Sequence, residues 1–419
     1  MDNVTHSIAG LLLAESAVQF RARRTGIEPS ARFSAFAAVS ALVASNLPDA
    51  DLFYTGVGGD RLAYMLHHRG YTHTVVIAIL GVALAWGVAL LVWRWRARAA
   101  AARDDANWLL GLIAVSVLGH LVLDWANSYG VHPFWPFDDR WLYGDAVFIV
   151  EPWFWVVAIP TLVVASRGRV ARVLLSLVLL AGLALAWRVE LVSTGAATVL
   201  TVGAVLSIVL ARVLGRGRRV AVAAAGWIAV MLLMAAGAAV ARDVAVRAVR
   251  ASDPMAELLD VVVTPMPANP VCTSVITVER AGESYRVVRA RVSGAPSLVD
   301  ASGCGIPDEG GAVFRPSSRR STPAVRWDTE WTAPRAELAA MARASCPVMA
   351  ALRFIRVPIW HPVSDSTIML GDARFGSASG NGFTDLLVPR RSAVCPDAVP
   401  PWTPPRLDLI GSTGLQGGA

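Results

Sequence analysis

Six mostly apolar stretches of about 20 residues lie within the first 240 residues, and they constrain the fold more than any other feature. A helix needs about 20 such residues to cross the hydrocarbon core of a bilayer, where only helices and closed barrels satisfy their backbone groups. Each stretch therefore predicts a transmembrane helix. The stretches are residues 74–93, 108–127, 146–166, 170–187, 194–210 and 220–240.

Two shorter apolar segments, 8–20 and 33–47, precede these stretches. They predict a helical hairpin that crosses only part of the bilayer or packs against the other helices. The apolar segments end near Arg250, and the remaining residues are ordinary in polarity and rich in Pro and Gly. The chain is thus expected to contain a membrane part followed by a part outside the bilayer.

Arginines in four loops predict the orientation, because short basic loops stay in the cytoplasm. If all four loops face the cytoplasm, the apolar segments alternate without conflict. The chain after Arg242 then lies outside, which predicts a multi-pass protein of the inner (plasma) membrane with an extracytoplasmic C-terminal region. The arginines occupy positions 21, 23, 24 and 32, then 94, 96, 98 and 103, then 167, 169 and 172, and finally 212, 216, 218 and 219.

The net charge of +7 belongs entirely to the membrane part. From Ala251 onward, sixteen arginines balance sixteen acidic residues. The basic excess is therefore a feature of the membrane loops, and a nucleic-acid partner is not expected. The lipid bilayer is the partner that the composition predicts.

Six of the seven histidines lie in the first 132 residues, each close to an Asp, an Arg or another His. Neutral imidazoles and carboxylates are the ligands that zinc and similar divalent ions take. In apolar surroundings such groups are costly unless they are paired or bound to a cation. The predicted topology brings four clusters to one membrane face, which is what a single metal centre requires. The clusters are DNVTH at 2–6, LPDAD at 47–51, HHRGYTH at 67–73 and HLVLD at 120–124.

The spacing within two clusters predicts how ligands meet. His120 and Asp124 are four residues apart and project from one helix face, although a buried His–Asp ion pair would also explain them. His68 and His73 cannot share a helix face, but Gly70 indicates a turn that brings them together. Arg69 then lies beside the ions, where a guanidinium can hold a phosphate in bidentate fashion. The alternative is a basic loop that touches lipid headgroups.

The remaining acidic residues have two interpretations each. Pro48 ends a helix and presents Asp49, which is expected to bridge two ions, and Asp51, which would ligate an ion or hold a histidine from behind. Asp after Pro is also ordinary turn chemistry. Asp2 is a ligand or a partner of the helix N-terminus, and Glu15 is a ligand's partner or faces the cytoplasmic end.

No competing catalytic pattern occurs. The sequence has no HExxH, no GxSxG, no P-loop and no GxGxxG before a helix. Cysteine cannot supply ligands to this centre, because Cys272, Cys304, Cys346 and Cys395 all lie in the C-terminal region.

The runs MDNVTHSIAG, SNLPDAD, HRGYTHT and GHLVLDWANSYGVHPFWPF resemble, in order over about residues 1–165, the YdjM-like family of membrane-bound metal-dependent hydrolases. That family is distantly similar to the zinc-dependent phospholipase C and single-strand nuclease superfamily, all-helical enzymes that hydrolyse phosphodiesters at up to three zinc ions. The resemblance implies a divalent metal, zinc favoured, with one to three ions. It implies as ligands His6, Asp49, His68, His73, His120 and Asp124.

The chain departs from that superfamily in one respect, because it has no second HxxxD-like pair after Asp124. A centre of one or two ions is therefore the expectation. The candidates to replace the missing pair are His132, Asp138, Asp139 and Asp145.

The C-terminal third reads as a small β-rich domain. β-branched and aromatic residues form short runs at 273–278 and 285–290 between Gly and Pro clusters, with one helix near 333–344. Four cysteines outside the cytoplasm predict one or two disulfides, with three possible pairings. His361 stands alone and reads as structural. The domain is expected to cap the metal centre or to bind an unknown protein partner.

The sequence thus predicts a mainly α protein, a multi-pass transmembrane helical domain followed by a small β-rich extracytoplasmic domain. The predicted divisions are a metal-binding, hydrolase-like membrane domain at 1–165, further transmembrane helices at 166–250, the β-rich domain at 251–400 and a disordered tail at 401–419.

The predicted function is metal-dependent hydrolysis, with a phosphoester as the favoured substrate. Metal-activated water would attack a phospholipid or lipid-linked phosphate, with Arg69 and Asp51 as the catalytic residues. One alternative is a non-catalytic protein in which the ions brace helices and the C-terminal domain binds a partner. Another is a proton or ion path, which would need ionisable residues at several depths.

Overall fold

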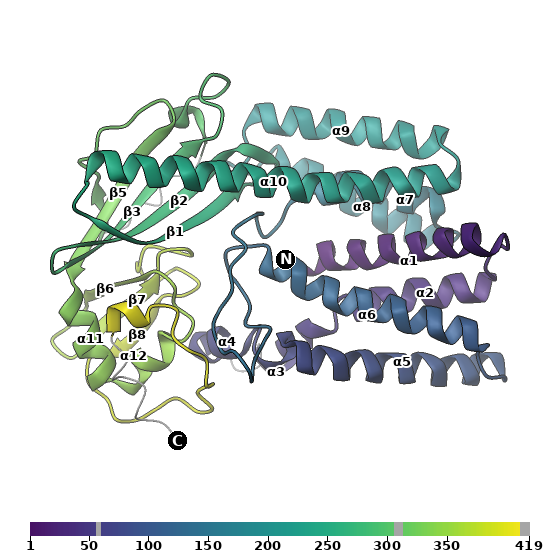
Figure 1. Cartoon of the computed structure of the whole chain (residues 1–419), viewed down its shortest axis with the longest axis horizontal. Helices are drawn as coiled ribbons and strands as arrows, with labels where there is room; N and C mark the ends of the chain where they lie inside the picture. The colour runs from purple at the N-terminus through teal and green to yellow at the C-terminus, as the bar shows by residue number, and fades with distance from the viewer. Residues whose placement is uncertain (56–59, 306–312, 411–419) are drawn as a thin grey trace.

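The computed structural model describes residues 1–55, 60–305 and 313–410, and it consists of a helical bundle with a β-rich part at one end (Figure 1). Short elements connect α2 to α5 at the junction of the two parts, namely η1 (Pro48–Asp51), α3 (Leu52–Thr55), α4 (Arg61–His67) and η2 (Tyr71–His73). The bundle helices are α1 (Asn3–Thr25), α2 (Ala31–Ala44), α5 (Val75–Ala97), α6 (Arg103–Trp125), α7 (Pro152–Ala165), α8 (Arg169–Ala186), α9 (Thr194–Val213) and α10 (Arg216–Ser252).

Five of these helices, α5, α6, α8, α9 and α10, have the length and apolar composition needed to cross a membrane. They correspond to five of the six predicted spans. Caps define where two of them begin, because Thr74 accepts the Ile77 N–H and Ser193 accepts the Ala196 N–H. The predicted fold class is confirmed.

The prediction of a full span at 146–166 is wrong. Only Pro152–Ala165 is helical there, and its 14 residues span about 21 Å, short of the ~30 Å hydrocarbon core. Pro152 occupies the first turn, and the Glu151 carboxylate caps the helix by accepting the Trp153 N–H at 3.1 Å. The apolar residues before Glu151 belong to an irregular segment instead.

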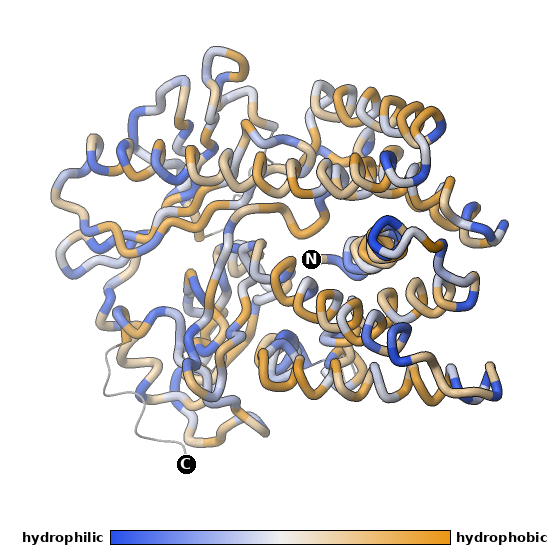
Figure 2. The backbone as a smooth tube through the Cα atoms, turned by 45° about the vertical axis from the view of Figure 1, so that its right-hand side comes forward, coloured by the Kyte–Doolittle hydropathy of each residue, from blue (hydrophilic) through white to orange (hydrophobic). Residues whose placement is uncertain are grey.

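The four arginine-rich loops gather at the end of the bundle that lies away from the sheets (Figure 1). Figure 2 shows hydrophilic residues at these turns and hydrophobic residues along the helices between them. Ion pairs join the helices near this end, since Arg21 of α1 contacts Asp105 of α6 at 2.6 Å and Arg216 of α10 contacts Glu15 of α1 at 2.9 Å. Glu15 therefore faces the basic end, which is one of its two predicted roles.

The β-rich part contains two antiparallel sheets. The larger has the strand order β1-β2-β3-β5-β4 and the smaller the order β6-β7-β8. Helix α11 confirms the helix predicted near 333–344. The strands are β1 (Glu257–Met266), β2 (Asn269–Ala281), β3 (Ser284–Ser293), β4 (Arg315–Pro316), β5 (Val325–Pro334), β6 (Pro358–Pro362), β7 (Thr367–Asp372) and β8 (Leu386–Pro389), and the short helices are η3 (Ala301–Gly303), α11 (Arg335–Ala344), α12 (Cys346–Ala351) and α13 (Leu407–Ile410).

Helix α10 connects the two parts without a break. Its 37 residues leave the bundle and run along the larger sheet (Figure 1). The alanine-rich end of the helix packs on the sheet, where Ala241 and Ala245 belong to one buried core with Val263 and Val275. Small side chains allow this close approach, so the sheet is held directly against the last membrane helix.

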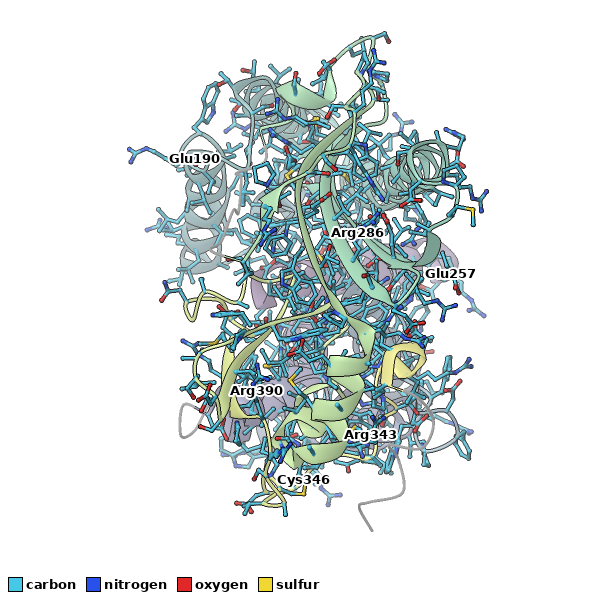
Figure 3. All side chains as sticks on the ribbon, turned by 90° about the vertical axis from the view of Figure 1, so that its left-hand side faces the viewer. Glu190, Glu257, Arg286, Arg343, Cys346 and Arg390 are labelled. Carbon is cyan, nitrogen blue, oxygen red and sulfur yellow. A yellow bond between two sulfur atoms is a disulfide. The ribbon has the colours of Figure 1, made fainter. Side chains whose placement is uncertain are left out.

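Two disulfides stabilise the β-rich part, Cys272–Cys304 beside the larger sheet and Cys346–Cys395 beside the smaller one. Figure 3 shows this end of the molecule, with Arg286 and Glu257 on the larger sheet and Cys346 among the smaller elements. The pair of disulfides agrees with the predicted number. Disulfides persist in oxidising compartments, which fits the predicted side of the membrane.

The predicted disordered tail, 401–419, begins with ten described residues that pack against the rest of the protein. The Trp402 side chain is completely buried, and its Nε1–H donates to the Leu66 carbonyl at 3.3 Å. Residues 411–419 lie outside the described part of the chain.

Glu151 links the two parts and should make their stability depend on pH. Its second carboxylate oxygen accepts the Ala268 N–H at 3.1 Å, and burial raises its pKa from 4.5 to about 7. Between pH 4.5 and about 7, Glu151 is protonated in the folded chain but ionised in the unfolded chain. Stability should therefore fall by about 3 kcal/mol as the pH rises from 4.5 to 7.

Thermal unfolding midpoints measured across pH 5 to 8 test this expectation. Glu151→Gln carries a neutral side chain at every pH, so its midpoint should vary less than that of the wild type. Equal pH slopes for the two proteins would contradict the assignment.

Candidate metal centre

The junction of bundle and sheets brings the predicted histidine and aspartate clusters together. Helix α2 ends at Ala44, and η1 begins four residues later at Pro48; the Asp49 and Asp51 side chains of η1 are buried. Gly70 makes the turn before η2, where a Cβ atom would lie 2.6 Å from the His67 carbonyl oxygen, so only glycine fits. This turn places the His68 and His73 rings 6.1 Å apart, as predicted.

Four buried side chains form the main cluster, Asp49, His73, His120 and Asp124. Each offers one ligand atom, and these atoms all lie within 4.8 Å of one another. His73 Nε2 lies 3.0 Å from Asp124 Oδ2 and 3.4 Å from Asp49 Oδ1, while His120 Nε2 lies 3.3 Å from Asp124 Oδ2. This buried group can hold a metal ion.

Hydrogen bonds on the far side of each ring orient the two histidines. His120 Nδ1 donates to the Ser45 carbonyl at 2.7 Å, which leaves Nε2 as the ligand atom. His73 Nδ1 lies 3.1 Å from the Thr72 hydroxyl and 3.4 Å from Asp51 Oδ2. Both Nε2 atoms therefore face the carboxylates of the cluster.

A second group shares Asp49 with the first and adds Asp51 and His68. Asp51 Oδ1 lies 3.0 Å from His68 Nδ1, and Asp51 Oδ2 accepts both the Arg69 backbone N–H and the Thr72 hydroxyl at 2.9 Å. Asp51 thus organises the whole loop that carries the histidines. The shared position of Asp49 fits its predicted role between two ions.

The electrostatics of the two loop aspartates favour cation binding. Burial alone would raise both pKa values, but the neighbouring His120 and His73 imidazoles hold the pKa of Asp49 well below its usual range. Bonds from His68 and His73 lower the pKa of Asp51 in the same way. Both carboxylates are ionised at neutral pH. Asp124 Oδ2 lies close to two imidazole nitrogens without a hydrogen bond to either, an arrangement that suits a shared cation.

His6 reaches the cluster from the first turn of α1. Its ring stacks on His120 with centroids 3.7 Å apart, and its Nε2 lies 3.2 Å from Asp124 Oδ1. The N-terminal amino group of Met1 donates to the same carboxylate. His6 therefore borders the four-residue cluster through Asp124 without belonging to it.

Arg69 lies beside the centre as predicted, but its guanidinium points at protein groups. It donates to Asp124 Oδ1 at 2.8 Å and to Asn127 Oδ1 at 3.2 Å, and it lies over the Tyr129 ring. Its Nε has no hydrogen-bond partner within the described residues. The buried charge thus balances the carboxylates of the cluster.

The other candidates have different roles. Asp2 caps α1 by accepting the Thr5 N–H at 2.9 Å, which is its second predicted role. Asp145 binds Arg356, Asp138 pairs with Arg140, and the His132 ring packs at a tilt against the Trp402 ring. None of these, nor Asp139, belongs to either metal-capable group of the described residues.

Sequence reasoning missed three groups that support the centre. Asn3 donates to Asp49 Oδ2 at 3.0 Å, Asn127 accepts from Arg69, and the Ser45 carbonyl orients His120. Asn3 stands within the first cluster and Asn127 three residues after Asp124, so their positions were a usable signal. A backbone carbonyl leaves no signal in the sequence.

Comparison with known proteins agrees with the predicted family over the region that holds the centre. The family model described as YdjM inner membrane protein matches residues 1–192. This range includes both groups of candidate ligands and Arg69. No curated protein and no solved structure matches the chain significantly.

Proposed function

We propose that this chain, whose first 192 residues match the YdjM inner membrane protein family, is a membrane-embedded metal-dependent hydrolase that cleaves phosphoesters. The observation that carries the proposal is the pair of buried ligand groups that share Asp49 next to the Arg69 guanidinium. Structural metal sites are usually closed by four protein ligands around one ion. A shared carboxylate between two groups is better suited to a centre of two ions that handles a phosphate. Zinc is the favoured metal, since the donors are imidazole and carboxylate.

The chain's own residues have distinct roles in this proposal. A divalent ion bound there supplies activated water and stabilises charge on the phosphoryl oxygens. His73, His120, Asp49 and Asp124 would hold it, with His6 and His68 as further ligands. Asp51 keeps the histidine loop in position. Arg69 binds the phosphate anion once its bond to Asp124 is exchanged for one to substrate.

The place of the centre favours a substrate that belongs to the membrane. The candidate ligands lie where the bundle meets the β-rich part, at the opposite end from the arginine-rich loops. If those loops face the cytoplasm, the centre lies near the outer boundary of the bilayer. A phospholipid or lipid-linked phosphate reaches such a place without leaving the membrane.

The alternative is a structural ion that braces the helices. It is favoured by the burial of the cluster and by the engagement of Arg69 with Asp124. Metal content does not separate the two functions, because both require bound metal.

A measurement of catalytic turnover separates the hydrolase from the structural-ion function. The purified protein is stripped with a chelator, reloaded with zinc, and tested on phospholipids and on a soluble phosphodiester such as bis(p-nitrophenyl) phosphate. We expect hydrolysis that disappears on stripping and returns on reloading. A fully loaded, folded protein that is inert on every substrate would favour the structural ion.

A further inference from the structure

An apolar groove runs along the membrane helices and reaches His120, one of the four residues of the main cluster, together with its neighbour His6. It has a volume of about 360 Å³ and lies between α1, α6 and α10. Ligand-binding cavities commonly measure roughly 300–1,000 Å³. Its lining is mostly apolar, with Leu12, Leu123 and Trp227 among the residues, and it also includes His6 and His120.

The rim of the groove faces the surroundings of the bundle rather than its core. Val115 and Val122 of α6 are 53% and 57% exposed, and Ile228 and Leu232 of α10 are 60% and 64% exposed. Both helices are long and apolar enough to span a membrane. Exposed apolar side chains on such helices face the hydrocarbon of the bilayer, so the groove opens toward lipid.

The length and direction of the groove match one leaflet. Along α1 it extends from His6 to Ser16, a rise of about 15 Å. That is half of the ~30 Å hydrocarbon core. The histidine end lies near the sheets and the other end lies toward the middle of the bundle. A chain in this groove would run from the membrane boundary to the midplane.

We propose that the groove holds one acyl chain of a bilayer phospholipid and thereby presents the phosphate headgroup to the metal centre. The apolar rim favours a hydrocarbon occupant, the length matches one leaflet, and the groove passes His6 and His120 at the edge of the metal centre. The cleavage of the headgroup rests on the proposed function, but the binding of the chain does not.

The test fills the groove at Gly119, which lines it on α6. A Cβ atom at this position meets no atom within 4 Å, so Gly119→Leu projects into open space without displacing the backbone. Gly87 of α5 is equally open but does not line the groove, so Gly87→Leu is the matched control. Each protein is placed in nanodiscs with a phospholipid that carries a diazirine at the end of one acyl chain, and adducts are mapped by mass spectrometry.

We expect adducts on groove residues of α1, α6 and α10 in the wild type and in Gly87→Leu. In Gly119→Leu the yield should fall at least about tenfold, while an unchanged thermal unfolding midpoint shows that the fold is kept. Equal yields in the two variants, or adducts spread evenly over all exposed helices, would overturn the groove as a binding site. So would a photoreactive benzoylphenylalanine at Ile228 that links two protein copies in place of lipid.

The two proposals fail in different ways. If the wild type forms the expected adducts but hydrolyses neither phospholipid nor soluble diester, the groove is supported as a binding site and the hydrolase function is contradicted. If the wild type hydrolyses the soluble diester but is labelled only at background level in the groove, the acyl-chain site is contradicted and the hydrolase function is supported.

Discussion

Replacing Asp124 with Ala should abolish metal binding and reduce the proposed hydrolysis by at least about 100-fold, the upper end of the loss seen when a partner supporting a metal ligand is removed. Among the described residues, Asp124 is the one carboxylate in contact with His6, Arg69, His73 and His120. The readouts are zinc stoichiometry and turnover. His361→Ala is the matched control, because His361 lies on β6, away from the cluster, and should keep both at wild-type levels.

The same substitution should also destabilise the fold, because it leaves the Arg69 guanidinium buried without its carboxylate. Breaking a buried ion pair from one side costs about 3–5 kcal/mol. Arg69→Met added to Asp124→Ala should recover part of that stability but none of the metal. An Asp124→Ala protein with full zinc content and full turnover would refute the assignment of Asp124 to the centre.

The second large effect is expected at Arg356, which joins the two parts of the protein. Its guanidinium contacts Asp145 at 2.9 Å and Asp260 of β1 at 2.8 Å, and it lies 4.0 Å from the centre of the Tyr143 ring. Arg356→Met should lower the free energy of unfolding by about 3 kcal/mol. This value is the low end of the roughly 3–5 kcal/mol cost of breaking a buried ion pair. The low end applies because Arg242 still pairs with Asp145 and Arg406 with Asp260.

Chemical denaturation followed by tryptophan fluorescence measures this loss. Arg343→Met removes an exposed arginine of α11 and should leave stability within about 0.5 kcal/mol of the wild type. Equal effects of the two substitutions would show that Arg356 does not hold the parts together.

Hydropathy predicted the long membrane helices well, because length and apolarity alone decide whether a helix can span a bilayer. It failed at 146–166, where the average over the window hid Glu151 and Pro152, the two residues that begin a shorter helix. Propensity likewise predicted α11 and the β-rich character of the C-terminal part. The choice of Cys272–Cys304 and Cys346–Cys395 among three pairings depends on sheet packing, which no local pattern contains.

The candidate centre was predictable where spacing encodes geometry. The interval between His120 and Asp124 defines a shared helix face, and Gly70 defines the turn between His68 and His73. The partner of Arg69 was not predictable, because Asp124 is 55 residues away and its contact depends on how α6 packs against the loop. Tertiary packing therefore decides that the Arg69 guanidinium binds Asp124 and is not free for an anion.

The unbroken course of α10 has a mechanical consequence. At about 1.5 Å per residue its 37 residues extend for about 55 Å, nearly twice the hydrocarbon thickness. The larger sheet packs against the C-terminal half of this helix, so it cannot rotate independently of the N-terminal half. A rotation of the sheet would therefore be transmitted along the helix to Trp227 and Met231, which line the groove.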